Sequence, residues 1–190
     1  MPDRARVGVL ISGRGSNMAA LIEAARAPDC PYEVALIVSN VVDAPGLALA
    51  AAAGIPQFAH SHRGVTRVAF DALIDGALSD AGVEYVALAG YMRLLSPGFV
   101  AKWQGRMINI HPSLLPAHKG LDTHQRAIDA GDTRHGCTVH LVTEALDEGP
   151  ILAQAEVPIL PGDDADTLAA RVLIEEHRLY PAALADLVRR

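Results

Sequence analysis

The sequence predicts an α/β fold, a Rossmann-like and mostly parallel sheet flanked by helices on both faces, with an antiparallel extension. One observation is that short runs rich in Val, Ile and Leu alternate with segments whose apolar residues recur at helical spacing. This alternation is typical of right-handed strand–helix–strand crossovers, which bury a parallel sheet on both faces. A second observation is that two late strand-like runs, 137–142 and 151–157, have no helical segment between them. These two runs are expected to form the antiparallel extension, and the polar–apolar alternation of the first predicts a half-exposed strand.

The N-terminal part of the chain predicts two strand–helix units. The run 7–11 is apolar and short, as expected of a buried strand, and 16–27 follows with its large apolar residues on one helical face. The run 34–38 predicts the second strand. The Ala-rich segment 46–53 predicts the second helix, which Gly54 ends.

The middle of the chain continues this order. A short third strand is predicted at 55–59, and apolar residues at helical spacing predict a helix around 70–78. The run 85–89 predicts the fourth strand. Ser96, followed by a proline, is typical of a helix N-cap with proline at the first helical position, so a short helix is expected over 97–103.

The last part of the chain predicts a strand at 107–110 and a helix at 123–130. A helix over 166–179 is opened by acidic residues, which suit its positive N-terminal end. Pro181 is expected to interrupt that helix before a final helical segment at 182–188.

Composition limits the class of protein. The 190 residues predict one domain, 1–190, and 51% of them are hydrophobic. With a formal net charge of −6, 4% aromatic residues and no run of Lys and Arg, no nucleic-acid partner is expected. Cys30 and Cys137 lie too far apart for a metal or redox motif and are expected to be reduced thiols. The run 7–11 is too short for a signal-peptide core and no apolar stretch reaches the ~20 residues of a membrane span, so a cytoplasmic protein without a membrane partner is expected.

A glycine-rich loop, Ser-Gly-Arg-Gly-Ser-Asn at 12–17, joins the first strand to the first helix. Glycines let the backbone approach a ligand, and the free N–H groups of a helix start suit a phosphate. Met18 departs from the dinucleotide-binding fingerprint, and the loop lacks the lysine of a P-loop. We therefore expect a monophosphate site with Gly15, Ser16 and Asn17 as the contacts. The alternative is a tight turn without a ligand.

The run Asn-Ile-His-Pro-Ser-Leu-Leu-Pro at 109–116 follows a buried strand. Because successive strand side chains point to opposite faces, Asn109 and His111 point the same way. An amide and an imidazole side by side are able to donate two hydrogen bonds to one oxygen, as an oxyanion requires. No other histidine stands at metal-ligand spacing from His111, so no metal is expected.

Loops after Ile11, Ala89 and Ile110 are expected to meet, since ligands of such sheets bind beyond the carboxyl ends of the strands. The apolar loop 91–95 lies in this region and suits a flat ring system, although a buried connection is the alternative. Asp147 lies in a turn between the two late strands. If these strands lie beside the strand that ends near Asn109, the carboxylate faces His111, favours the imidazolium form and steers a proton-carrying water.

These stretches together resemble the phosphoribosylglycinamide formyltransferases, the folate-dependent transformylases of purine synthesis. The resemblance extends from Val7 to about Pro181. The motif at 109–116 is typical of the wider formyltransferase superfamily, and the Ser-Gly-x-Gly-Ser-Asn loop narrows it to this branch. The other matching stretches are 88–96 and 146–150.

The resemblance implies transfer of the formyl group of 10-formyltetrahydrofolate, a co-substrate, to the amine of glycinamide ribonucleotide, without a metal and in a monomer or homodimer. It assigns substrate contacts to Gly15, Ser16, Asn17 and Glu176. It assigns folate contacts to Arg67, Met92, Arg93, Leu94 and Leu95. It makes Asn109, His111 and Asp147 the catalytic residues.

Two positions depart from the family pattern. Lys119 stands where proline is frequent and is expected to loosen its loop, and Asp122 stands where some members have a second histidine, so its carboxylate would repel that of Asp147. The segment 133–135 is expected to form a lid.

Three alternatives to the function implied by the resemblance stay open. Two are a methionyl-tRNA formyltransferase and a formyltetrahydrofolate deformylase, both of which usually carry an extra domain. The third is a non-catalytic nucleotide- or folate-binding module.

Overall fold

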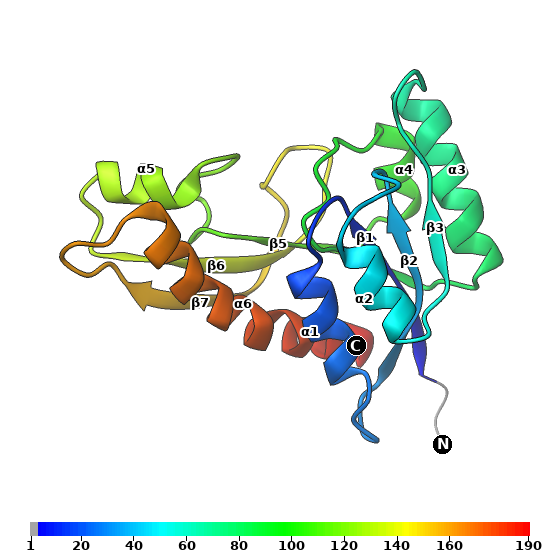
Figure 1. Ribbon diagram of the computed structural model, residues 1–190, viewed down its shortest axis with the longest axis horizontal. Coiled ribbons are helices and arrows are strands. Elements are labelled where there is room, and N and C mark those ends of the chain that lie inside the picture. Colours follow the sequence, from blue (N-terminus) through cyan, green and yellow to red (C-terminus); the bar gives the residue numbers. More distant parts are fainter. Residues whose placement is uncertain (1–3) are drawn as a thin grey trace.

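A computed structural model describes residues 4–190, so residues 1–3, at the start of the segment for which no signal peptide is expected, lie outside it. A single seven-stranded sheet forms the centre of these residues, in the order β3-β2-β1-β4-β5-β6-β7 (Figure 1). Strands β1 to β5 run parallel, whereas β5–β6 and β6–β7 are antiparallel pairs, which confirms the predicted fold class. The strands are β1 Ala5–Ile11, β2 Tyr32–Ser39, β3 Gln57–Ala59, β4 Tyr85–Leu88, β5 Met107–His111, β6 Arg134–Leu141 and β7 Ile151–Pro158.

Helices cover both faces of the sheet (Figure 1). Successive residues of β1 point to opposite faces, so Val9 joins the core under α1, α2 and α6 while Leu10 joins the core under α3 and α4. Within residues 4–190, no helix combines the length and the apolarity needed to cross a membrane. The helices are α1 Ser16–Ala24, α2 Gly46–Ala52, α3 Arg67–Asp80, α4 Pro97–Lys102, α5 Thr123–Asp129 and α6 Ala165–Val188.

Helix α6 is continuous through Pro181, so the predicted interruption is wrong. A proline removes one helical hydrogen bond, but buried residues on both sides, including Tyr180 and Leu184, pack on the sheet and hold the helix together. The Tyr180 hydroxyl also donates to the carbonyl oxygens of Leu88 and Ile108, at 2.9 and 3.2 Å. Through these contacts α6 is fixed to β4 and β5 directly beneath the loops that follow them.

Strand β6 is buried on both faces, so the predicted half-exposed strand is wrong. Its polar side is covered by the loop after β5, because the Thr138 hydroxyl donates to the Ser113 carbonyl (2.7 Å) and accepts from the Leu115 N–H (3.0 Å). The segment 133–135 leads into this strand and His135 is 1% exposed. The expectation of a lid there is therefore also wrong.

Candidate active site

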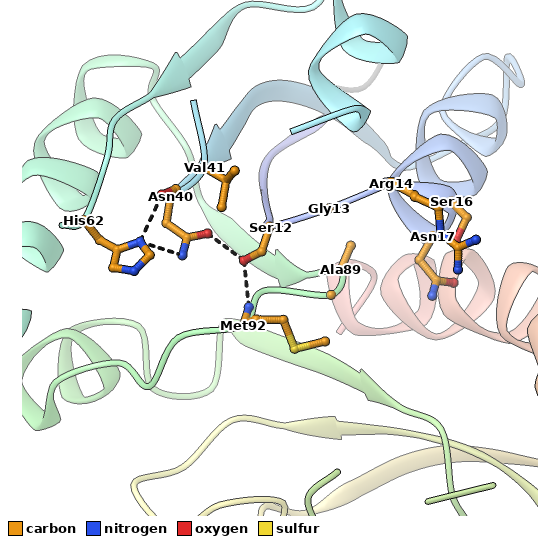
Figure 2. Close-up of a pocket in the computed structure, with 12 residues that line it drawn as sticks. Ser12, Gly13, Arg14, Ser16, Asn17, Asn40, Val41, His62, Ala89 and Met92 are labelled. Carbon is orange, nitrogen blue, oxygen red and sulfur yellow. Dashed lines mark hydrogen bonds between the residues drawn. The ribbon is translucent and has the colours of Figure 1, made fainter. Parts of the chain in front are cut away.

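Two adjacent cavities lie at the carboxyl ends of the central strands. The first, here called the α1 cavity, has a volume of about 500 Å³ and is lined by residues 12–17 together with residues after β2, β3 and β4 (Figure 2). The second, here called the β5 cavity, has a volume of about 680 Å³ and is lined by the loops after β4, β5 and β6. Gly90 and Met92 line both cavities, so the two spaces adjoin. The loops after β1, β4 and β5 thus meet as the sequence predicts.

The α1 cavity contains the start of α1. Gly15 precedes this helix in the left-handed region, with φ 73°, and no side chain caps the helix and no acidic residue lies in its first turn. A Cβ on Gly15 would lie 3.1 Å from the Gly46 Cα, so both the backbone angle and the space favour glycine. The uncapped N–H groups and the positive end of α1 suit an anion such as a phosphate.

Asn17 joins this helix start to α6. Its Nδ2 donates a 2.6 Å hydrogen bond to Oε2 of Glu176, which is 7% exposed, and its Oδ1 has no partner among the described residues. Burial raises the pKa of Glu176, while the Asn17 hydrogen bond and the charge of His111 act in the opposite direction. A buried carboxyl group beside this uncapped helix start is able to accept from an amine or amide of a ligand.

Asn109 faces His140 across the β5–β6 ladder, where the two residues are register partners. Burial lowers the pKa of His140, opposed by its hydrogen bond to Leu141 and the charge of Asp147, so the ring is neutral near pH 7. With His140 Nδ1 donating to the Leu141 carbonyl (3.0 Å), its Nε2 accepts from Asn109 Nδ2 at 3.3 Å. This contact uses one amide hydrogen of Asn109 and leaves the other available to the β5 cavity.

His111 ends β5 with an oxygen near each ring nitrogen. Its Nε2 donates to the His118 carbonyl at 3.0 Å, and its Nδ1 lies 3.5 Å from Oδ2 of Asp147. The second distance is longer than an ordinary N–H···O hydrogen bond and describes a close charge contact. His111 and Asp147 are 6% and 8% exposed, so their interaction is little screened by solvent.

Asp147 adopts the left-handed region with φ 53°. Oδ2 accepts from the Gly120 N–H at 3.0 Å, and Oδ1 lies 3.7 Å from His140 Nε2. Beside it, Lys119 donates to Glu148 at 2.8 Å, so this lysine ties two loops together instead of loosening one. Asp122 lies in the wall of the same cavity, at the N-cap of α5.

Most of the residues singled out from the sequence lie on the two cavities. Gly15, Ser16 and Asn17 line the α1 cavity, and Glu176 reaches it through Asn17. Arg67 is exposed at the first residue of α3 and lines neither cavity. The β5 cavity is lined by Met92, Arg93, Leu94, Leu95, Asn109, His111 and Asp147.

The β5 cavity is mostly apolar at its rim. Met92 and Leu94 are 71% and 56% exposed on one side, and Leu121 and Leu146 are 73% and 58% exposed on the other. Such a wall suits a flat ring system. The lining of the cavity also includes exposed polar residues, Asp122, Thr143 and Glu144 among them. Within residues 4–190, no three His, Cys, Asp or Glu side chains are grouped to hold a metal ion.

Two residues of the site escaped the sequence analysis. His140 occupies the polar position of an alternating strand, and Ser12 belongs to the glycine-rich loop. Only the pairing of β6 with β5 places His140 beside Asn109, and that register has no local sequence signal. Ser12 lies in the wall of the α1 cavity, where its hydroxyl contacts Asn40 and Met92 (Figure 2).

Comparison with known proteins matches residues 5–184 to the family described as "Formyl transferase". The chain is 50% identical over 187 residues to the trifunctional purine biosynthetic protein adenosine-3 of Drosophila pseudoobscura pseudoobscura, covering 97% of this chain but 14% of that protein. It is 43% identical over 178 residues to the phosphoribosylglycinamide formyltransferase of Escherichia coli (strain K12), covering 93% and 84% of the two chains. A crystal structure of phosphoribosylglycinamide formyltransferase from Brucella melitensis matches with a TM-score of 0.95 and 54% identity, over 99% of this chain and 97% of that one. The chain belongs to the formyl transferase family.

Proposed function

We propose that the chain transfers the formyl group of 10-formyltetrahydrofolate to the glycine amine of N1-(5-phospho-D-ribosyl)glycinamide. The products are formylglycinamide ribonucleotide and tetrahydrofolate, as in the synthesis of purines (IMP). The family and the relatives named for this reaction support the proposal. The observation that carries it is the meeting of Asn109, His111 and Asp147 beside the junction of the α1 cavity, with its uncapped helix start, and the mostly apolar β5 cavity. We also propose that residues 1–190 act as one domain on these small molecules, as a monomer or homodimer.

The nucleotide would bind in the α1 cavity. The N–H groups of Ser16 and Asn17 would hold the phosphate, with Gly15 allowing the close approach. Glu176 would accept a hydrogen bond from the glycinamide part, because its carboxyl group is fixed beside Asn17. The amine would then point toward Gly90 and Met92, where the α1 and β5 cavities adjoin.

The folate would bind in the β5 cavity with its formyl group at the inner end of that cavity. Residues Met92, Arg93, Leu94 and Leu95 would hold the pteridine through apolar contacts and backbone groups. Arg67, an exposed cation at the start of α3, would attract the glutamate carboxylates at the other end of the folate.

Asn109 and His111 would stabilise the charge that develops on the formyl oxygen. The free amide hydrogen of Asn109 would supply one hydrogen bond. His111, when protonated, would give its Nε2–H to this oxygen in place of the His118 carbonyl, while Asp147 stabilises the imidazolium from Nδ1. Because His111 is buried, a hydrogen bond from its ring to the formyl oxygen would be stronger than in water, once the ring has left the His118 carbonyl.

Asp147 would also serve the proton transfer that balances the reaction. The amine nitrogen forms a bond to the formyl carbon, the bond from this carbon to N10 breaks, and one proton passes from the amine to N10. A water held by the Asp147 carboxylate would carry that proton. The two cavities would supply the remaining acceleration by holding both reactants in one place.

The test is to incubate the purified chain with glycinamide ribonucleotide and 10-formyltetrahydrofolate, and to follow tetrahydrofolate by absorbance and the nucleotide by mass spectrometry. The proposal expects the nucleotide to gain one formyl group for each folate consumed. Folate deformylation without a formylated nucleotide would indicate a hydrolase instead. Tight binding of both ligands without turnover would indicate a non-catalytic binding module.

A further inference from the structure

Ser12 connects the two cavities. It follows β1 directly, and its backbone N–H donates to the Gly90 carbonyl at 3.1 Å. Its hydroxyl oxygen accepts from the Met92 N–H at 2.7 Å, so one residue holds the 90–92 segment at two points (Figure 2). The Met92 side chain is 71% exposed. The hydrogen bonds to Ser12 therefore hold this segment together with the partly buried Tyr91, which packs against the core under α3 and α4.

The Ser12 hydroxyl is itself fixed by buried partners. A hydroxyl has one hydrogen to donate and two lone pairs to accept with. The hydrogen is donated to Oδ1 of Asn40 at 2.6 Å, which leaves a lone pair directed at Met92. Asn40 is 3% exposed, and its Nδ2 and carbonyl oxygen lie 3.1 and 3.0 Å from His62 Nδ1, so His62 contacts Asn40 in either tautomer.

The position of Ser12 relates this network to both ligands. On one side it continues into residues 13–17, which line the α1 cavity at the start of α1. On the other side it holds Gly90 and Met92, which belong to the walls of both cavities. An anion that orders the 13–17 loop thereby also orders the 90–92 segment, and a second ligand then loses less conformational entropy when it binds.

We propose that Ser12 is a positioning residue that couples the two cavities, so that a nucleotide in the α1 cavity tightens binding of the folate in the β5 cavity. The inference rests on the proposed function for the identity of the two ligands. Coupling between sites is reciprocal, so the folate tightens nucleotide binding by the same factor. The coupling factor, the ratio of the two folate dissociation constants, is the quantity that distinguishes this role from simple structural support.

The test uses a pair of ligands that cannot react, glycinamide ribonucleotide and tetrahydrofolate. Calorimetry gives the dissociation constant of tetrahydrofolate with and without saturating nucleotide. In the unaltered chain the nucleotide is expected to tighten tetrahydrofolate binding by about 5-fold or more, within the range usual for coupled sites. In Ser12→Ala the Met92 contact is lost while the backbone bond to Gly90 remains, so the factor is expected to fall by about half or more. Ser12→Thr, which keeps the hydroxyl, is expected to retain most of the factor.

Ser61→Ala is the matched control, because it removes a nearby hydroxyl that bonds to the Arg63 N–H and lines neither cavity. If Ser12→Ala does not fold, Asn40→Ala is the decisive variant. It frees the Ser12 hydroxyl to rotate and should therefore reduce the coupling factor. An unaltered chain without coupling, or an undiminished factor in the decisive variant, overturns the inference. Absence of formyl transfer with the unaltered chain would instead overturn the proposed function, and a coupling factor is still measurable if both ligands bind.

Discussion

The carboxylate of Asp147 lies 3.5 Å from Nδ1 of His111, although His111 ends β5 and Asp147 lies in the loop that follows β6. The contact depends on the antiparallel extension, which returns the chain to the side of β5.

Replacement of His111 by alanine should reduce turnover by about 10²–10³-fold, because one donor to the developing oxyanion is lost. Steady-state formyl-transfer kinetics measure the effect. His60→Ala is the control, since this exposed histidine lines neither cavity and its ring nitrogen lies near the carbonyl of the neighbouring Ser61. Near-normal turnover of the His111 variant would exclude the proposed role.

Asp147→Asn should fold, because asparagine tolerates the left-handed backbone angle and its oxygen still accepts from the Gly120 N–H. Without the carboxylate charge of residue 147, the imidazolium of His111 loses its ionic partner. The water that carries the proton also loses the group that holds it. Turnover should fall by about 10²-fold or more, and steady-state formyl-transfer kinetics measure the loss. The matched variant is Glu148→Gln, which removes the charge from the Lys119 contact outside the cavity wall and should leave turnover unchanged.

Gly15→Ala should lower both stability and nucleotide affinity. An alanine with φ near 73° costs about 1–2 kcal/mol, and the Gly46 Cα only 3.1 Å from the new Cβ adds strain. Gly64→Ala separates these effects, because Gly64 has φ 74° and nothing within 4 Å of a Cβ. Urea unfolding of both variants should show the larger loss at Gly15, and equal losses would argue against close packing as the reason for glycine there.

His135 should make the protein less stable in mild acid. Burial, with smaller effects of His124 and His118, lowers its pKa to about 4, whereas the unfolded chain retains the ordinary value of 6.5. Below pH 6.5 the unfolded state therefore binds a proton that the folded state excludes. The contribution of the neutral His135 to the free energy of unfolding is fully present above pH 6.5. It declines by about 2–3 kcal/mol as the pH falls to 4.

Urea midpoints at pH 7, 5 and 4 measure this decline in the unaltered chain and in His135→Gln. The variant should lose less stability over the same interval, because it has no group to protonate at that position. The exposed His60, replaced by glutamine, should reproduce the pH dependence of the unaltered chain. Parallel pH dependence for the His135 variant would contradict the assignment.

The parallel sheet and much of the site could be predicted because their signals are local. The glycine-rich loop, the Ser96 cap and the alternation of Asn109 with His111 are properties of neighbouring residues. The sequence did not predict the continuity of α6 through Pro181 or the burial of both faces of β6, because each depends on packing against distant segments. The same holds for His140, whose importance arises from its register with Asn109.

Glu176 and Tyr180 lie one turn apart on α6, the first bonded to Asn17 and the second to the backbone of β4 and β5. The middle of α6 therefore cannot unfold locally without breaking contacts to the centre of the sheet. Amide hydrogens around Glu176 should exchange with solvent only in the rare openings that unfold the domain as a whole, whereas those of the 90–95 loop should exchange through local fluctuations.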